Sequence, residues 1–146
     1  DIKVEKFKEQ FNADLANGLG NLLSRTTNMV EQYCGGVVKS VDAPKPLGKA
    51  EQQTLKYDFT GSLAATWKAI TWANQAIDTA KPWALAKSAK PADVKKLKLL
   101  LAQLVAQLLE ISHALTSYLP VTAATMTKAL RAKKIVKAPP LFQRVV

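Results

Sequence analysis

PADVKKLKLLLAQLVAQLLEISHALTS, residues 91–117, is the stretch that decides the fold of this chain. Its apolar residues recur every three or four positions, which is the period of one face of an α-helix. Pro91 suits the first turn of such a helix, and Asp93 complements its positive N-terminal end. We therefore predict a helix over about residues 92–117. Its apolar face comprises Leu97, Leu100, Leu104, Leu108, Ile111, Leu115 and Leu119, widened by Leu101 and Val105.

The segment from about Val4 to Tyr33 shows the same period and predicts a first helix. Cys34-Gly35-Gly36 ends it, because glycine readily adopts the left-handed conformation that caps a helix C-terminus. Gly18 and Gly20 lie inside this helix and weaken it by up to ~1 kcal/mol each relative to alanine. Each glycine therefore needs a reason, such as close packing or a nearby ligand.

The remaining segments complete an all-α pattern. A helix is predicted from about Ala50 or Thr60 to Asp78, and residues 37–50 before it form a surface connection. Pro82 ends that helix because proline disfavours helix in the residue before it, and a short turn over residues 83–87 follows. Another helix covers residues 121–132. The sequence thus predicts an antiparallel bundle of four to five helices over residues 1–132, followed by a tail over residues 133–146.

Composition limits the function classes that fit. The 146 residues hold one cysteine, Cys34, and one histidine, His113, too few for a disulfide framework or a Cys/His zinc site. No stretch reaches the ~18 apolar residues of a membrane span, and the first residues do not resemble a signal peptide. The net charge of +10 favours an anionic partner. Residues 91–146 alone carry nine basic residues against two acids, although lysines can also simply keep a helical protein soluble.

The motifs of common enzyme classes are missing. The pair Gly48-Lys49 lacks the upstream glycine of a phosphate-binding loop, and Gly18-Leu19-Gly20 lacks the third glycine of a dinucleotide-binding turn. We interpret His113 as a partly buried or surface residue of its helix, and Cys34 as a small buried hydrophobe. No pair of acids has the pattern of a general acid and base. The residues indicate no active site.

A polar stripe follows the first helix, about 100° around from its leucine face. Lysine and glutamate are the better helix formers for a merely solvated surface, whereas amide and guanidinium groups are the ones that read base edges. An asparagine and an arginine one turn apart could therefore grip one base. The alternative, that Asn21 caps a helix or hydrogen-bonds within the bundle, stays open. The polar stripe consists of Asp14, Asn17, Asn21, Arg25 and Asn28.

Trp83 follows Pro82 at a predicted corner between two helices. An exposed indole there could stack on an unpaired base, a contact worth about 1–3 kcal/mol, or it could plug the end of the bundle. Trp67 lies on the apolar face of its helix and is predicted to be core. Trp72 falls off that face, and its place is left open.

Several motifs resemble the C-terminal anticodon-binding bundle of methionyl-tRNA synthetases, which are class I aminoacyl-tRNA synthetases. FNADLANGLGNLLSR, residues 11–25, is similar to the family's N-A-D-L-A-N-x-L-G-N-L-x-x-R signature. The order Trp67, Ile70, Asn74 and Ile77, followed by PWALAK at residues 82–87, resembles a second signature. LPVTA at residues 119–123 and PLFQR at residues 140–144 are weaker matches. The matches span nearly the whole chain in order.

The resemblance implies that Asn21, Arg25 and Trp83 read the CAU anticodon of tRNA. These are the residues that the polar stripe and the corner had already indicated. Possible supporting tRNA contacts are Asn17, Asn28 and Lys87. Two positions depart from the family pattern: Ala76 stands where a tyrosine is usual, and Gln143 replaces a common proline. Neither departure touches a proposed base reader.

The resemblance also implies that this chain alone is not an enzyme. We find no H-I-G-H or K-M-S-K-S motif, so ATP and methionine would bind a catalytic domain outside this sequence, and the chain itself needs no cofactor or metal. The expected partners are initiator and elongator tRNA-Met and that catalytic domain, on which the tail over residues 133–146 could pack instead of on the bundle. No membrane or DNA partner is expected. The location would be cytoplasmic, with an organellar matrix left open. The alternative function is a non-catalytic helical protein-interaction module derived from the same bundle.

Overall fold

The computed structural model describes residue 6 and residues 18–45, 59–116 and 120–138. All regular structure in these ranges is helical, and no strand occurs in them, which confirms the all-α class. The helices are α2 (Gly20–Cys34), α4 (Phe59–Ala80), α5 (Pro82–Lys87), α6 (Pro91–Leu115) and α7 (Pro120–Leu130).

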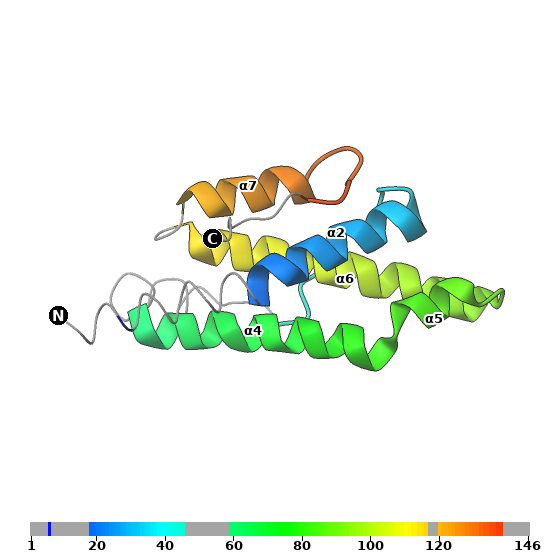
Figure 1. The fold of residues 1–146 in the computed structure, drawn as a ribbon, viewed down its shortest axis with the longest axis horizontal. Helices are drawn as coiled ribbons and strands as arrows, with labels where there is room; N and C mark the ends of the chain where they lie inside the picture. The colour runs from blue at the N-terminus through cyan, green and yellow to red at the C-terminus, as the bar shows by residue number, and fades with distance from the viewer. Residues whose placement is uncertain (1–5, 7–17, 46–58, 117–119, 139–146) are drawn as a thin grey trace.

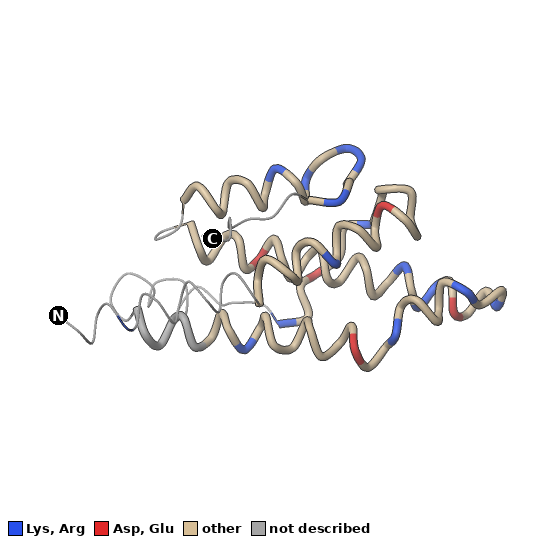
Figure 2. The backbone as a smooth tube through the Cα atoms, in the orientation of Figure 1, with Lys and Arg blue, Asp and Glu red and all other residues tan. Residues whose placement is uncertain are grey.

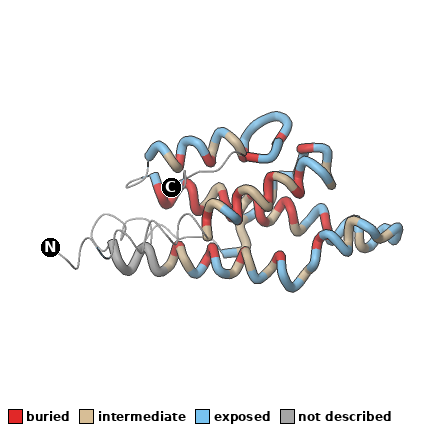
Figure 3. Tube along the Cα trace, in the orientation of Figure 1, coloured by how far each residue is buried: buried red, intermediate tan, exposed pale blue. Residues whose placement is uncertain are grey.

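The helix predicted over residues 92–117 is α6, and it forms the centre of the bundle. It runs antiparallel to α4 and to α7, which lie on either side of it, while α2 crosses it obliquely (Figure 1). Pro91 occupies its first turn, as predicted. Its apolar face is buried against the other helices (Figure 3). The fully buried side chains of α6 include Leu101, Leu104, Leu108, Ile111 and Leu115, while Leu119 lies outside the described residues.

Within the described residues, α6 is also the helix whose length and apolarity would suffice to cross a membrane. It has 25 residues, and its most apolar 18-residue window has a mean hydropathy of 1.2. This value is an average over the window, and Lys98, Gln103, Gln107 and Glu110 interrupt the run, so no 18 consecutive apolar residues occur in it, as predicted. Burial gives the reason for this apolarity, since 56% of that window is covered inside the bundle.

The C-terminus of α2 confirms the predicted glycine stop. Gly35 has φ 63° and ψ 22°, the left-handed conformation, and the Gly36 N–H donates to the Val30 carbonyl over 3.0 Å. The Gly35 N–H donates to the same carbonyl, and the Val37 N–H donates to the Cys34 carbonyl, which the helix itself leaves unpaired, over 3.3 Å. The part of the predicted first helix that precedes residue 18 lies outside the described residues, apart from Lys6.

Close packing accounts for Gly18. A Cβ atom added there would lie 3.0 Å from the Trp67 side chain on α4, which is closer than two carbon atoms normally approach. Trp67 is half-buried and packs against the core, as predicted, and Trp72 does the same. The glycine therefore lets α4 and the segment leading into α2 approach each other.

We expect Gly18→Val to lower the free energy of unfolding by about 1–3 kcal/mol, because the larger side chain must displace the Trp67 ring. Gly18→Ala should be much milder, because the gain in helix propensity offsets a small shift of the ring. Urea unfolding followed by tryptophan fluorescence measures both variants. A valine variant as stable as the wild type would show that Trp67 has room to move.

The connection between α4 and α6 differs from the prediction. The expected short turn after Pro82 is the helix α5. Pro82 occupies its first turn, and the Ala84 N–H donates to the Lys81 carbonyl over 2.9 Å. Lys81, between the two helices, has φ 50° and ψ 65°. Proline thus ends α4 as predicted, but its fixed φ also begins a new helix in another direction.

Residues 37–45 form the expected surface connection as far as they are described, and one buried side chain fixes its end. Gln107 on α6 is fully buried, and its amide bonds both backbone groups of Lys45. The Lys45 N–H donates to Gln107 Oε1 over 2.8 Å, and Gln107 Nε2 donates to the Lys45 carbonyl over 3.0 Å. The polar residue that interrupts the leucine face therefore pairs with the connection and is not left unsatisfied.

The segment after α7 folds back onto α2. The Ile135 N–H donates to the Gly36 carbonyl over 2.7 Å, and the Ala138 N–H donates to Thr27 Oγ1 over 2.9 Å. The side chains of Ile135 and Ala138 are buried. Residues 135–138 thus belong to the packed bundle, whereas PLFQR lies outside the described residues.

Candidate nucleic-acid interface

The described part of the polar stripe lies on the outer face of α2. Asn21 is exposed, and Arg25 and Asn28 are partly exposed. The intervening residues Leu22 and Leu23 are buried in the core, so the polar stripe lies on the other side of the helix. Within the described residues Asn21 has no hydrogen-bond partner. These residues therefore do not support the alternative that Asn21 hydrogen-bonds inside the bundle. Asp14 and Asn17 lie outside the described residues.

Arg25 joins α2 to the last turn of α4. Its Nη2 atom donates to Asp78 Oδ1 over 3.3 Å. The two side chains are 40% and 68% exposed, so the pair contributes little to stability, about 0–1 kcal/mol. The contact instead holds the guanidinium group beside the end of α4, just before Lys81. Arginine carries five N–H donors, and within the described residues the contact with Asp78 uses only those of Nη2.

Trp83 lies just beyond that end of α4, in the first turn of α5. It is 43% exposed, whereas Trp67 and Trp72 pack against the core. Pro82 beside it is buried and anchors the corner. Part of the Trp83 side chain is therefore open to solvent, and its role as a stacking surface stays a prediction. Lys87 follows one turn later on the same side of α5 and is exposed.

Sequence reasoning missed Asp78. It lies 53 residues from Arg25, and no local pattern links the two positions. Only the approach of α2 to α4 brings the carboxylate to the guanidinium group. Asn21 and Arg25 lie on α2 and Trp83 lies on α5, and the ion pair with Asp78 joins Arg25 to the C-terminal end of α4.

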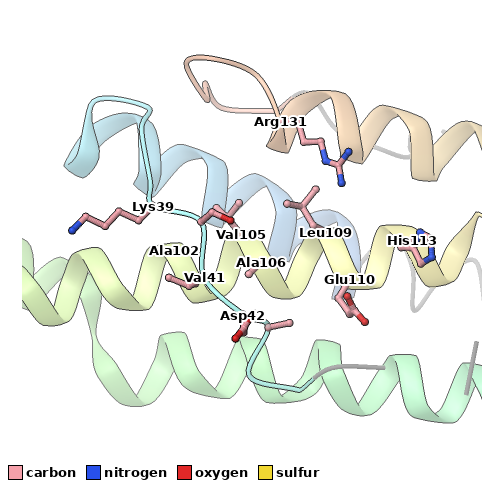
Figure 4. A pocket seen from close by; sticks show the side chains of 12 residues that line it. Lys39, Val41, Asp42, Ala102, Val105, Ala106, Leu109, Glu110, His113 and Arg131 are labelled. Carbon is pink, nitrogen blue, oxygen red and sulfur yellow. The ribbon is translucent and has the colours of Figure 1, made fainter. Parts of the chain in front are cut away.

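His113 lies apart from this corner. It is exposed on α6, as predicted, at the edge of a cavity of about 330 Å³ (Figure 4). Groups of both charges line this cavity: Asp42 and Glu110 are acidic, and Lys39 and Arg131 are basic. No group of three potential metal ligands occurs among the described residues.

Cys34 is half-buried at the end of α2. Burial raises the pKa of the Cys34 thiol above its ordinary value, and the charge of Lys98 offsets part of this rise. A raised pKa leaves less thiolate at neutral pH, and thiolate is the nucleophilic form. The cysteine therefore has the chemistry of a packing residue.

We expect iodoacetamide to alkylate Cys34 more slowly near neutral pH than it alkylates an unstructured cysteine peptide. The midpoint of the pH–rate profile should lie above that of the peptide, because deprotonation requires a higher pH. Lys98→Gln should move the midpoint further up, since it removes the favourable charge. A midpoint below that of the peptide would contradict this assignment and indicate an activated thiol.

The chain is similar in sequence to curated methionine–tRNA ligases, while no protein-family model matches it. It is 38% identical to the enzyme of Enterococcus faecalis over 96 residues, which cover 57% of this chain and 14% of that protein. It is 33% identical to the enzyme of Clostridium perfringens over 141 residues, which cover 88% of this chain and 22% of that protein. The similarity lies in the C-terminal part of these relatives. The chain spans less than a quarter of their full length.

The fold has a counterpart among solved structures. A crystal structure of Mycobacterium tuberculosis methionyl-tRNA synthetase bound by methionyl-adenylate matches 93% of this chain with a TM-score of 0.75. The match covers 31% of that protein at 22% sequence identity, so it supports the fold alone. The free form of the same enzyme matches with a TM-score of 0.64.

Proposed function

Because this chain belongs to the methionyl-tRNA synthetase family, as a homologue of the C-terminal part of its members, we propose that it is the domain that recognises the CAU anticodon of tRNA-Met. One observation carries the proposal. Arg25 is held 3.3 Å from Asp78 at the end of α4, and the exposed Trp83 follows in the next helix. A base-reading side chain and a stacking side chain thus lie near the same end of α4.

Each group has a distinct role in this reading. Single-stranded loops are recognised by splaying the bases out, stacking them on aromatic rings and bonding their edges. Trp83 supplies the stacking surface, and Asn21 and Arg25 supply amide and guanidinium groups one helical turn apart. The exposed Arg25–Asp78 pair is weak enough for a base edge to share or replace it. Asn17, Asn28 and Lys87 serve as supporting contacts.

The domain works as part of a larger enzyme under this proposal. The whole synthetase would couple methionine to its tRNA with ATP, and this domain would select the initiator and elongator tRNA-Met molecules. Catalysis and the binding of ATP and methionine would belong to the catalytic domain. We place the enzyme in the cytoplasm.

Binding to two short RNA hairpins tests the proposal. One hairpin carries CAU in its loop and the other differs from it at one anticodon base, and each is titrated at two salt concentrations. Tryptophan fluorescence reports binding. A Trp83→Phe variant shows which part of the fluorescence change comes from Trp83 and which part comes from Trp67 and Trp72. We expect a CAU preference that persists at the higher salt concentration, because base contacts do not depend on counterion release.

The result separates the two functions. Equal binding of both hairpins that disappears with salt would contradict anticodon reading. It would favour the helical protein-interaction module, whose positive charge would then serve docking to an acidic partner.

A further inference from the structure

Basic residues of α5 and of the first part of α6 lie along the backbone at one end of the molecule (Figure 2). All of them are exposed. They come from the end of α4, from α5 and its connection to α6, and from the first turns of α6, which packs against α5. We refer to Lys81, Lys87, Lys90, Lys95, Lys96 and Lys98 as the end cluster.

The described acids at this end already have partners. Asp93 accepts a hydrogen bond from Ser88 Oγ over 2.6 Å, and Asp78 pairs with Arg25 over 3.3 Å. Asp93 also complements the positive N-terminus of α6. The lysine charges are therefore not neutralised by ion pairs within the described residues, and they create a positive potential at this end.

Trp83 lies between Lys81 and Lys87 in the chain, at the start of α5. Lys87 follows it on the same side of α5, and Lys90 comes directly before α6. A base stacked on Trp83 would bring the RNA strand, with its phosphates, into the range of these lysines. Phosphate contacts of this kind position an RNA without reading its sequence.

A second group of basic residues lies elsewhere. Figure 2 shows it at the end of α7 and in the turn that follows, apart from α5. The bond between Ile135 N–H and the Gly36 carbonyl ties that turn to the C-terminus of α2. Sequence position alone had combined both groups, because both contribute to the charge of residues 91–146. We refer to Lys128, Arg131, Lys133, Lys134 and Lys137 as the tail group.

Resting on the proposed function, we propose that the end cluster binds the phosphates of the anticodon stem and that the tail group does not. The double-stranded stem adjoins the loop that Trp83 would hold, and an A-form stem is recognised chiefly through its shape and its backbone. Lys81, Lys87 and Lys90 lie before residue 91, so the stem site extends outside the basic C-terminal region. The electrostatic part of tRNA binding comes from six lysines at one end of the bundle.

Two matched triple variants test this assignment. The first is Lys90→Gln, Lys95→Gln, Lys96→Gln in the end cluster, and the second is Lys128→Gln, Lys133→Gln, Lys137→Gln in the tail group. All six residues are exposed, and each triple variant removes three charges. Circular dichroism verifies that both variants keep the helical fold. Binding of the two anticodon hairpins, and of the CAU loop as a stemless oligonucleotide, is measured over a range of salt concentrations.

The end-cluster variant should bind both hairpins about 10- to 100-fold more weakly, with a salt slope reduced by about two to three. Its ratio of affinities for the two loops should stay that of the wild type. The stemless oligonucleotide should lose much less affinity, and the tail-group variant should behave as the wild type.

Other results overturn the assignment or the proposed function separately. Equal losses in the two triple variants, or an equal loss for the stemless oligonucleotide, would overturn the stem assignment while a CAU preference in the wild type still stood. A wild type without CAU preference would overturn the proposed function. If the end-cluster variant alone then lost affinity for both hairpins, the cluster would stand as a phosphate site without base reading.

Discussion

Arg25→Ala is expected to cost roughly 1–3 kcal/mol in discrimination at one anticodon base, which is about a 5- to 150-fold loss of preference. The guanidinium group can bond the edge of a base with two parallel N–H donors, and alanine offers none. Asp78 holds the guanidinium group beside the end of α4. Removing the guanidinium group should therefore reduce discrimination between anticodons more than the overall affinity for RNA. Competition between hairpins that differ at each anticodon position in turn measures the effect and identifies the base.

Three matched variants sharpen this result. Arg25→Lys keeps the charge but loses the planar fork, so it should lose discrimination while keeping salt-dependent affinity. Asp78→Asn removes the ion pair and should have a smaller effect. Trp83→Ala should lower the affinity for every loop by about 1–3 kcal/mol, because stacking tolerates any base. If Arg25→Ala left the CAU preference unchanged, its assignment as a base reader would be wrong.

Gly36→Ala is expected to produce the largest loss of stability, about 2–4 kcal/mol. Gly36 has φ 85°, a conformation that costs alanine about 1–2 kcal/mol. A Cβ atom there would also lie 2.8 Å from the Ile135 carbonyl oxygen and 2.6 Å from Lys134 Cγ. The lysine side chain can move, but the backbone oxygen belongs to the segment that bonds the Gly36 carbonyl. The substitution should therefore push residues 134–135 away from the end of α2.

The neighbouring glycine provides the control. Gly35 has φ 63°, and an added Cβ atom would meet nothing within 4 Å. Gly35→Ala should therefore cost only the conformational term, about 1–2 kcal/mol. Urea unfolding gives both values, and hydrogen exchange at the Ile135 amide reports whether the contact opens. Equal losses of unfolding free energy in the two variants would show that residues 134–135 can move away at no cost in stability.

The leucine period predicted α6 well, because a buried helix must repeat its apolar residues every three to four positions. Pro91 and Gly35 likewise set helix ends through local conformation alone. Residues 83–87 show where this local reasoning ends. Proline indicated the end of α4, but whether a turn or a helix followed depended on how residues 82–87 pack against α6.

The candidate site shows the same division. Helical spacing placed Asn21 and Arg25 one turn apart, and the proline before Trp83 indicated a corner. Neither pattern showed that α2 approaches the last turn of α4, where Asp78 meets Arg25. The sequence indicated that Gly18 needs a structural reason but not what the reason is, because its neighbour Trp67 lies 49 residues away in the chain.

By itself, the sequence determined the long helices of the described residues, α2, α4, α6 and α7, together with their apolar faces and the excess of positive charge. These properties depend on neighbours within one or two helical turns, and a single chain displays such neighbours directly. Only the tertiary structure decided which lysines share one end of the molecule, which acid pairs with Arg25, and that residues 135–138 bond to α2 and its C-terminal glycine. Those relations join residues far apart in the chain, so they are fixed by how the helices pack and not by any local period.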